Sequence, residues 1–283
     1  MTSIAILITC FNRKDKTLAC LKSIYGQQGI ENYKVETFIV DGGSKDGTID
    51  AVHEQYPQVH IELHDGLFWA GGMRVAWKMA DAAGEFDYYW LLNDDTALKS
   101  DCLEKLMKSE EQCRKEYGKA GIIVGGTCDN NGNYTYGGIK LDKLEHSNGH
   151  IVMPSDKMQE IDLGNANIML VPSEVYKKNG GFCEVYTHGC ADYDYTLHAR
   201  HHGIPVLLAP TYLGRCENDH GHSWKSQKSS LRERIKFLYS PKGLAYKEYL
   251  YYIRIFFPSE YYSAKFKLWM KTLFPIIWTK FKK

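Results

Sequence analysis

The sequence predicts an α/β fold in which helices flank a mostly parallel central sheet. Over the first 125 residues, short apolar runs alternate with segments whose apolar residues recur every three or four positions. This alternation is typical of βα units, which pair their strands in parallel through right-handed crossovers. Segments rich in Asp, Asn and Gly follow several of the apolar runs. Because ligands of parallel sheets bind beyond the carboxyl ends of the strands, these segments predict a binding site.

The expected strands and helices follow one another along the chain. Strands are expected at Ile4–Ile8, Val35–Val40, His60–Leu63, Tyr88–Leu92, Lys119–Val124 and Ile168–Val171. Helices are expected around Leu18–Ile24 and Ile49–Tyr56, over Gly71–Ala83, from an N-cap at Ser100, and over Ser173–Asn179 and Ala191–Gly203. The turn-forming residues Asp129–Asn133, followed by Tyr134–Tyr136, predict a hairpin.

Size and composition limit the classes of protein that remain. A chain of 283 residues with 44% hydrophobic and 24% charged residues is typical of a globular protein. The net charge of +1 gives no indication of a nucleic-acid partner. The eight cysteines form no CxxC pair, which favours reduced thiols in the cytoplasm. No apolar run reaches about 18 residues, and no signal peptide is recognisable, so a cytoplasmic protein is expected.

Charge is distributed unevenly between the body and the end of the chain. From Leu231 to Lys283 there are 12 Lys and Arg residues against 3 Glu and no Asp, interleaved with aromatic residues. We therefore expect an α/β domain at 1–225, made of two halves at 1–125 and 126–225, and a helical tail at 226–283. Such a tail suits the inner face of an anionic membrane. The alternative is a helical subdomain packed on the body or on a second copy of the chain, as in a homodimer.

Two polar segments follow the first two expected strands. The first runs from Thr9 to Arg13, and its polar groups are well placed to contact a nucleotide, although an ordinary loop would look alike. The second runs from Val40 to Thr48 and begins with Asp41. An acidic residue there can hydrogen-bond a ribose or a base, and the glycines that follow let a ligand approach the backbone. A Gly- and Asp-rich turn is the alternative.

Two pairs of carboxylates complete the candidate chemistry. Asp94 and Asp95 follow the apolar strand Tyr88–Leu92, and oxygen ligands at such a position suit Mg²⁺ or Mn²⁺. Asp192 and Asp194 begin an expected helix and point in different directions on it. One of them could remove a proton from an attacking hydroxyl group. Capping of a helix is the alternative role for each pair.

These four features, in this order, resemble the family 2 glycosyltransferases, which are inverting enzymes of the GT-A fold. The resemblance covers roughly residues 3–215, and the segment Leu67–Arg74 resembles rhamnosyltransferase-like members. It implies a nucleoside-diphosphate sugar as donor, a metal ion, and a glycan or lipid-linked glycan as acceptor. By the same resemblance, 1–225 is the catalytic domain, 1–125 its nucleotide-sugar-binding half and 126–225 its acceptor-binding half. Surface polysaccharide assembly is the setting that we expect for such a reaction.

The resemblance also implies roles for individual residues. Asn93 stands where the family has the first Asp of an Asp-x-Asp motif, so Asp95 is the expected metal ligand. Asp192 is the expected base, although Ala191 replaces a common Glu. The expected donor-binding residues are Thr9, Phe11, Asn12, Arg13, Asp41, Gly71, Gly72, Arg74, Asn93 and Asp94. The expected acceptor-side residues are Trp69, Asn165 and Asp194, and His220 is a second candidate metal ligand.

Three of these assignments have open alternatives. Trp69 could be a stacking platform or a core residue, and Arg74 could face a phosphate or solvent. His220 and His222 stand in a polar segment, where solvated histidines are common.

Two rival functions remain. A nucleotidyltransferase would need a Gly-rich loop after the first strand, and Thr9–Lys14 has no glycine. A catalytically silent binding protein of the same fold is the second rival, because Asn93 and Ala191 depart from the family pattern.

Overall fold

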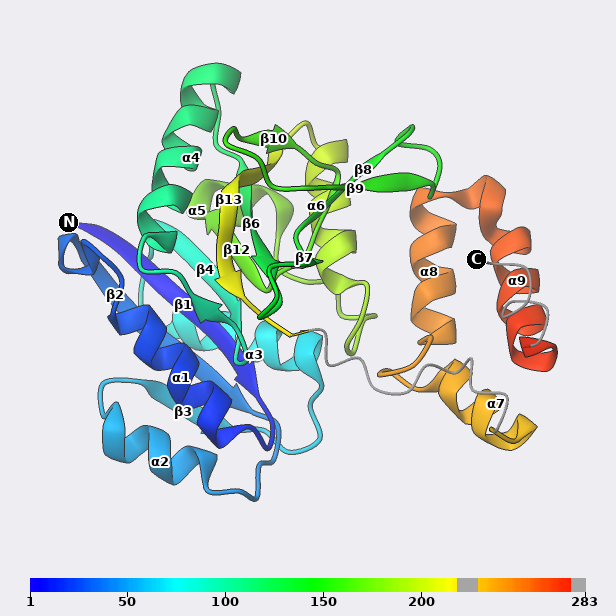
Figure 1. The fold of residues 1–283 in the computed structure, drawn as a ribbon, viewed down its shortest axis with the longest axis horizontal. Helices are drawn as coiled ribbons and strands as arrows, with labels where there is room; N and C mark the ends of the chain where they lie inside the picture. The colour runs from blue at the N-terminus through cyan, green and yellow to red at the C-terminus, as the bar shows by residue number, and fades with distance from the viewer. Residues whose placement is uncertain (218–228, 276–283) are drawn as a thin grey trace.

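The computed structural model describes residues 1–217 and 229–275, and it shows an α/β body with a group of helices beside it (Figure 1). The strands are β1 (Thr2–Cys10), β2 (Tyr33–Asp41), β3 (His60–Leu63), β4 (Tyr88–Asn93), β5 (Ala97–Leu98), β6 (Ile122–Cys128), β7 (Tyr134–Tyr136), β8 (Gly138–Leu141), β9 (Gly149–Val152), β10 (Gln159–Glu160), β11 (Leu163–Gly164), β12 (Ile168–Pro172) and β13 (Val206–Arg215). The helices are α1 (Lys14–Tyr25), α2 (Thr48–Gln55), α3 (Trp69–Ala83), α4 (Cys102–Tyr117), α5 (Ser173–Asn179), α6 (Ala191–His201), α7 (Leu231–Tyr239), α8 (Tyr246–Phe256) and α9 (Tyr261–Leu273).

The central sheet confirms the expected α/β class. Its main path is β10-β13-β6-β12-β4-β1-β2-β3, while β5 pairs with β13 and β7 pairs with β6. Strands β1, β2, β3 and β4 are paired in parallel, and so are β6 and β13. Strand β12 runs antiparallel between β4 and β6. A small second sheet has the order β11-β8-β9. The predicted boundary between the two halves, at residues 125 and 126, falls inside β6.

The structure corrects several predicted boundaries. Helix α4 takes Asp101 as its N-cap residue, because the backbone and hydroxyl oxygens of Ser100 accept hydrogen bonds from Gln28 instead. Helix α3 begins at Trp69 rather than Gly71, and strand β6 begins at Ile122 rather than Lys119. The hairpin of β6 and β7 is confirmed. Its turn is held by the Asp129 carboxylate, which accepts hydrogen bonds from the backbone N–H groups of Asn131 and Asn133.

Strand β13 is the largest element that the sequence did not predict. Its first residues, Val206–Ala209, are apolar and buried, but Pro210 and Thr211 interrupt the pattern. Thr211 has a positive φ of 61°, and the register against β6 shifts on either side of Tyr212. The irregular middle of the strand therefore hides its alternation, although its pairing with β6 is parallel.

Hydrophobic residues cover both faces of the sheet. In β1, Ala5 and Leu7 belong to a cluster with helices α3 and α6, whereas Ile4, Ile6 and Ile8 belong to a cluster with α1 and α4. This alternation follows from the two-residue period of a strand. A sheet buried on both faces leaves its strand ends as the accessible edge, and the polar segments lie there.

Gly72 allows α3 to pack closely against β1. A Cβ atom at this position would lie 2.5 Å from Thr9 Cγ2. We expect Gly72→Ala to lower the free energy of unfolding by about 1 kcal/mol or more, because overpacking costs more than the helix propensity of alanine returns. Denaturant titration measures this change. Gly189→Ala is the control, since its added methyl group meets no atom within 4 Å. Equal stability of the two variants would contradict this account of the contact.

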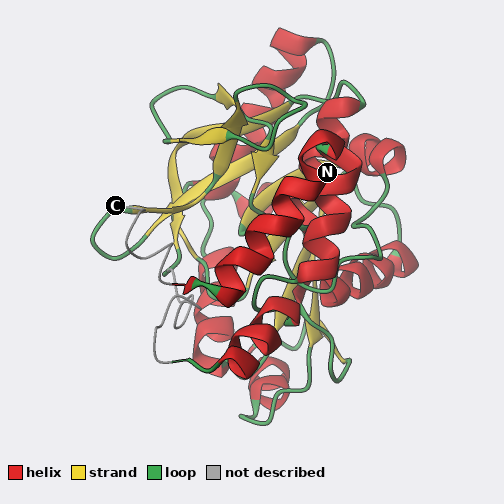
Figure 2. Cartoon of the chain, turned by 90° about the vertical axis from the view of Figure 1, so that its right-hand side faces the viewer, coloured by secondary structure: helices red, strands yellow, loops and turns green. Residues whose placement is uncertain are grey.

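The helical tail packs against the body. Phe256 of α8 contacts His198 of α6, with ring centroids 5.0 Å apart, and Ile253 and Phe257 are fully buried. Figure 2 views the molecule from the side of these helices, which lie in front of the body. The predicted boundary at residues 225 and 226 lies outside the described residues. Among the helices that the structure describes, none is both long and apolar enough to cross a membrane.

Candidate active site

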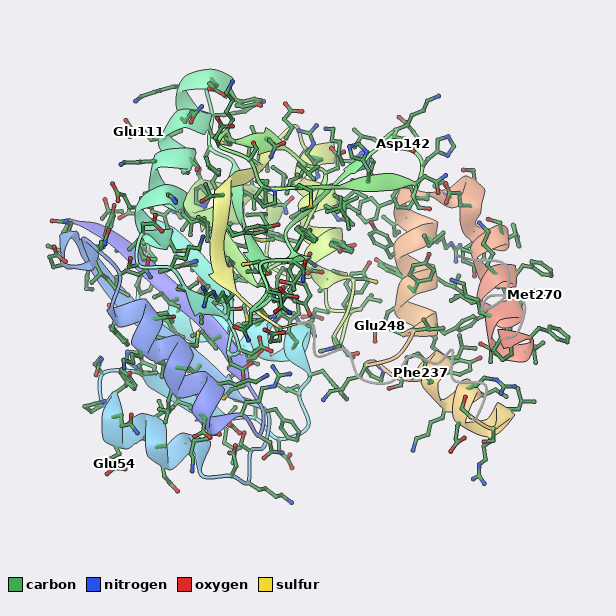
Figure 3. All side chains as sticks on the ribbon, in the orientation of Figure 1. Glu54, Glu111, Asp142, Phe237, Glu248 and Met270 are labelled. Carbon is green, nitrogen blue, oxygen red and sulfur yellow. The ribbon has the colours of Figure 1, made fainter. Side chains whose placement is uncertain are left out.

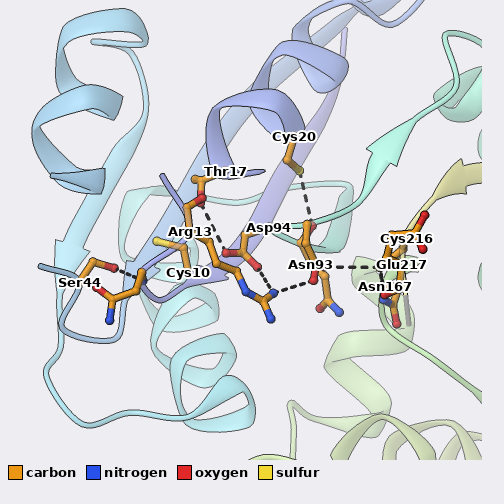
Figure 4. A network of polar contacts seen from close by, with 12 residues as sticks. Cys10, Arg13, Thr17, Cys20, Ser44, Asn93, Asp94, Asn167, Cys216 and Glu217 are labelled. Atoms are coloured by element: carbon orange, nitrogen blue, oxygen red, sulfur yellow. Dashed lines mark hydrogen bonds and ion pairs between the residues drawn. The ribbon is translucent and has the colours of Figure 1, made fainter. Parts of the chain in front are cut away.

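The carboxyl ends of β1, β2 and β4 meet at one edge of the sheet. Cys10 lies opposite Asp41 in the pairing of β1 with β2, and Thr9 lies opposite Asn93 in the pairing of β1 with β4. The polar segments that follow these three strands are therefore neighbours, as Figure 4 shows. The register of the sheet brings together the expected donor-binding residues of these segments.

Asp41 is fully buried and shapes the loop that follows β2. Its Oδ1 accepts hydrogen bonds from the backbone N–H groups of Gly43 at 2.9 Å and Ser44 at 2.6 Å. Gly43 has a φ of 104°, which favours glycine. The loop is tied to the segment after β1, because Ser44 Oγ accepts a 2.7 Å hydrogen bond from the backbone N–H of Asn12. Asp41 thus organises the place where we expect a nucleotide.

Arg13 lies between the two carboxylates that follow β4. Its Nη1 is 3.1 Å from Asp94 Oδ1 and 2.6 Å from Asp95 Oδ2. The pKa of Asp94 is raised to about 7, chiefly by burial, and the Arg13 guanidinium opposes this rise while the charge of Asp95 adds to it. Two carboxylates therefore converge on one cation at this edge of the sheet, and Figure 4 shows Arg13 beside Asp94.

The residues of this edge fit a divalent metal ion. Asp94 and Asp95 supply carboxylate oxygens, which Mg²⁺ and Mn²⁺ prefer. The buried Oδ1 of Asn93 has no hydrogen-bond partner among the described residues, so a polar acceptor remains for a ligand. Within those same residues, no three His, Cys, Asp or Glu side chains group as a metal site. A metal ion here would take its remaining ligands from substrate or water. His220 and His222 lie outside the described residues.

The segment Gly164–Asn167 joins this edge to helix α6. The carbonyl oxygen of Asn167 accepts a 3.3 Å hydrogen bond from the backbone N–H of Asn93. The side chain of Asn167 contacts Cys216 Sγ, which lies 3.5 Å from Asp95 Oδ1. Two residues earlier, Asn165 Nδ2 donates to Asp192 Oδ2 at 3.3 Å. One short segment therefore contacts both the Asn93–Asp95 group and the expected base.

Asp192 lies in the first turn of α6. The helix begins after Cys190, whose φ of 65° is unusual for a residue with a side chain. The Asp192 carboxylate is half-buried and accepts hydrogen bonds from Asn165 and from the backbone N–H groups of Ala166 and Tyr193. Burial raises the pKa of Asp192, and these hydrogen bonds lower it. A raised pKa suits a general base.

Asp194 and Arg74 hold the chain that leads into α6. Asp194 is buried, and its carboxylate accepts a 2.8 Å hydrogen bond from Tyr186 Oη and lies 3.5 Å from His198 Nδ1. Arg74 donates to the carbonyl oxygens of Cys183 at 3.0 Å and Tyr186 at 2.8 Å. Arg74 therefore holds the backbone before α6, and its contact with a phosphate stays a prediction. The acceptor-side role of Asp194 stays a prediction, and its contacts are those of a packing residue.

The start of α3 contributes small and aromatic residues to the same region. Gly71 and Gly72 are buried in the first turn, near Leu67 and Thr9. Trp69 is half-buried and packs on Phe182, with ring centroids 5.3 Å apart, which agrees with a core role on one side of its ring. Phe11, in contrast, is 47% exposed at the end of β1. Donor contacts of Phe11 and the two glycines stay predictions.

A family model decides the affiliation of the chain. The model described as "Glycosyl transferase family 2" matches residues 5–154, just over half of the sequence. The chain belongs to glycosyltransferase family 2. The match includes the segments around Thr9, Asp41 and Asn93, so the expected family is confirmed for the donor half. No curated protein matches the chain in sequence.

Solved structures of glycosyltransferases share the fold of this family 2 member. They include a mannosyltransferase from Pyrobaculum calidifontis in complex with GDP-Man and Mn²⁺, which is 16% identical with a TM-score of 0.53 over 82% of this chain and 60% of its own. S. aureus TarS (residues 1–349) in complex with UDP-GlcNAc is 15% identical with a TM-score of 0.55, over 96% of this chain and 80% of that one. The chain thus spans less than two thirds of the mannosyltransferase. The GT-A fold is confirmed.

Sequence reasoning missed some contacts of the glycosyltransferase site. Cys216 follows β13, and neither its residue type nor its neighbours in the sequence place it beside Asp95. Nothing in the sequence around Tyr186 likewise indicates that its hydroxyl group donates a hydrogen bond to Asp194 at the start of α6. Both contacts depend on how distant segments meet. The repeated Asn residues of Gly164–Asn167 were the one available signal, and that segment proves to be the link.

Proposed function

We propose that this family 2 glycosyltransferase moves a sugar from a nucleoside diphosphate to a hydroxyl group with inversion at the anomeric carbon. The acceptor is a glycan or a lipid-linked glycan, in the assembly of a surface polysaccharide at the cytoplasmic side of the membrane. One observation carries the proposal: segment Gly164–Asn167 contacts both Asp192 and the Asn93–Asp95 group. A single displacement requires a base and a leaving-group site in a fixed relative position, and a segment in contact with both supports such an arrangement.

The donor binds at the strand edge in this proposal. Thr9, Asn12 and Asp41 form the nucleoside side of the site, and Asn93 offers its buried Oδ1 to a ribose hydroxyl. Arg13 and Asp94 lie next to the diphosphate. The similar solved structures hold GDP-Man and UDP-GlcNAc. A hexosyl or deoxyhexosyl donor is our proposal for this chain, in line with the rhamnosyltransferase-like segment Leu67–Arg74.

Mg²⁺ or Mn²⁺ would be held by Asp95, with the diphosphate oxygens as further ligands. When bound, the ion supplies positive charge that stabilises the departing diphosphate. Arg13 now pairs with Asp95, so its guanidinium must turn toward the phosphates when this carboxylate binds another cation. A guanidinium binds phosphate oxygens well, so Arg13 would exchange its ion pair with Asp95 for one with the phosphates.

The acceptor approaches from the side of α6. Asp192 takes the proton of the attacking hydroxyl group as the new glycosidic bond forms. Asn165, which donates to Asp192 Oδ2, holds the carboxylate in place. Trp69 lies at the start of α3 and offers a surface for a sugar ring. Because attack and departure occur on opposite faces of the sugar in one step, the configuration inverts.

A nucleotide panel tests the donor assignment. We measure thermal unfolding with UDP, GDP, dTDP and the matching nucleoside monophosphates, with Mn²⁺ and with EDTA. At least one diphosphate should raise the melting temperature, and Mn²⁺ should enlarge the shift. Stabilisation by monophosphates alone, or by no nucleotide, would overturn the proposal.

Helix α9 has a second apolar face that points away from the body. Its inner face buries Ala264, Leu268 and Thr272. The opposite face exposes Tyr262, Phe266 and Leu273, whose side chains are 80%, 65% and 41% exposed. Lys265, Lys267 and Lys271 lie between the two faces along the helix. An exposed aromatic face bordered by lysines suits an anionic lipid surface, which is the partner that we propose.

Surface variants test this contact without disturbing the packed tail. Tyr262→Ser combined with Phe266→Ser should at least halve the fraction of protein that sediments with anionic vesicles. Phosphatidylcholine vesicles should bind neither form. The matched control is Tyr239→Ser, which is 45% exposed on α7. The proposal would be contradicted if the wild type, the double variant and Tyr239→Ser sedimented equally, or if binding did not depend on the charge of the lipid. A drop in dimer content of the double variant would favour a homodimer through this face.

A further inference from the structure

The tail places a positive charge over the strand edge of the candidate active site. Lys242 lies in the turn between α7 and α8, far from the catalytic segments in sequence. Its Nζ lies 5.6 Å from the ring centroid of Phe11 and 6.0 Å from that of Phe68. Phe11 directly follows β1, and Phe68 is the N-cap residue of α3. The ammonium group therefore stands where the first strand ends and the third helix begins.

The turn that carries Lys242 is tightly built. The backbone N–H groups of Gly243 and Ala245 both donate to the carbonyl oxygen of Ser240, at 2.9 and 3.1 Å. The Leu244 N–H donates to the carbonyl oxygen of Phe237 at 3.1 Å. An ideal Cβ at Gly243 would lie 2.0 Å from that same carbonyl oxygen, so no side chain fits there. The position of the Lys242 backbone is thus fixed by its neighbours.

Helix α8 is fastened to the same part of the body. Glu248, which is labelled in Figure 3, accepts hydrogen bonds from the backbone N–H of Thr187 at 3.0 Å and from its hydroxyl group at 2.6 Å. The carbonyl oxygen of Thr187 accepts a 3.2 Å hydrogen bond from the N–H of Ala70, in the first turn of α3. This chain of contacts connects the tail to the start of α3 beside Phe68. The turn that carries Lys242 is therefore next to a helix, α8, that is hydrogen-bonded to the body beside the candidate active site.

The charge of Lys242 is available to an anion. Among the described residues, no carboxylate lies within ion-pair distance of its Nζ, whereas Arg13 is engaged with both Asp94 and Asp95. The fully buried Asp41 and the Asp94–Asp95 pair make the edge rich in carboxylates. A bound diphosphate adds further negative charge, which an ammonium group beside it would stabilise. The rings of Phe11 and Phe68, both within 6.0 Å of the amine, limit the positions that it can take.

We propose that Lys242 is a donor-site residue whose ammonium group binds the diphosphate of the nucleotide sugar. This inference rests on the proposed function and adds a residue from outside the segment that the family model matches. The tail then completes the donor site, and a chain cut before α7 would lack this contact.

Calorimetric binding of nucleoside diphosphate tests the role of Lys242. The full-length variants are Lys242→Met and Lys242→Arg, with Lys247→Met as the control, because Lys247 is also exposed on the tail. The probes are the diphosphate preferred by the wild type and its free nucleoside, each with Mn²⁺ and with EDTA. We expect Lys242→Met to weaken diphosphate binding about tenfold while nucleoside binding is unchanged. Lys242→Arg should keep most of the affinity, and Lys247→Met should match the wild type.

Each other outcome overturns a defined part of the account. Unchanged diphosphate affinity in Lys242→Met removes the residue from the donor site but leaves the proposed function standing. Equal losses for diphosphate and nucleoside indicate that the lysine only holds the Phe11 and Phe68 rings, which also overturns the inference. A wild type that binds no nucleoside diphosphate overturns the proposed function together with the inference.

Discussion

Asp192→Asn is expected to lower the rate of sugar transfer about a hundredfold or more and to leave donor binding nearly unchanged. Asparagine keeps the size of the side chain and its hydrogen bond with Asn165, but it cannot accept a proton at neutral pH. Loss of a general base typically costs a factor of about 10²–10⁴ in rate. In the proposed function the donor binds at the strand edge, which the substitution does not touch.

Steady-state kinetics and calorimetry on the same variant separate the two effects. Glu184→Gln is the matched control, because this exposed acid lies a few residues before α6 and has no hydrogen bond or ion pair among the described contacts. It should turn over normally. Near-normal turnover of Asp192→Asn would remove Asp192 from the mechanism, and loss of donor affinity would place it on the donor instead.

The pH dependence of turnover in the wild type should reveal the ionisation of Asp192. Burial raises the folded-state pKa of Asp192. As a general base, this carboxylate would be active only when ionised. Turnover should therefore fall as pH decreases through this raised pKa, with an acid limb above the ordinary aspartate value of about 4. The limb should disappear from the residual activity of Asp192→Asn. A limb that persists in this variant would belong to another residue.

Asp95→Ala and Asp41→Ala are expected to weaken donor binding in different ways. Asp95→Ala should lower the affinity for nucleoside diphosphate at least about tenfold in Mn²⁺, or 1.4 kcal/mol, with little change in EDTA. Asp41→Ala should lower it under both conditions. The reason is that Asp95 faces the proposed metal, whereas Asp41 holds the loop of Gly43 and Ser44.

Calorimetry with Mn²⁺ and with EDTA measures both variants in one design. Asp41→Asn is the useful control, because it keeps an acceptor oxygen for Gly43 and Ser44 and should retain more affinity than Asp41→Ala. Thermal unfolding of each variant checks that the loop change has not unfolded the domain. Identical behaviour of Asp95→Ala and Asp41→Ala with and without metal would refute the division of roles between them.

The sequence was sufficient for the fold of the donor half because its elements have regular patterns. Strands β1, β2 and β4 are apolar, and each ends in polar residues at Thr9, Asp41 and Asn93. Parallel pairing then requires those residues to meet, and the structure confirms that they do. Strand β13 was not predicted because Pro210 and Thr211 interrupt its apolar pattern. Without knowledge of the partner strand, such an interruption cannot be distinguished from a loop.

Contacts between candidate site residues were predictable where a motif follows a strand and not where distant segments meet. Asp192 and Asn165 were both singled out, but their contact depends on how α6 packs against the segment after β11. Arg74 was given two roles, and its actual partners, two carbonyl oxygens more than a hundred residues away in the chain, have no sequence signal. Lys242 belongs to a basic tail with many lysines, and nothing in the sequence distinguishes it from the others. Only the structure shows that it lies near the ring of Phe11.

Release of nucleoside diphosphate from a panel of nucleotide sugars is the most direct test of the central claim. The protein is supplied with a lipid-linked glycan extract as acceptor, and product is followed over time with Mn²⁺ and with EDTA. We expect release from at least one donor, dependent on Mn²⁺ and lost in Asp192→Asn. Donor binding without release under any condition would identify a silent binding protein. Formation of pyrophosphate from a nucleoside triphosphate and a sugar phosphate would identify a nucleotidyltransferase, and either result would contradict the account.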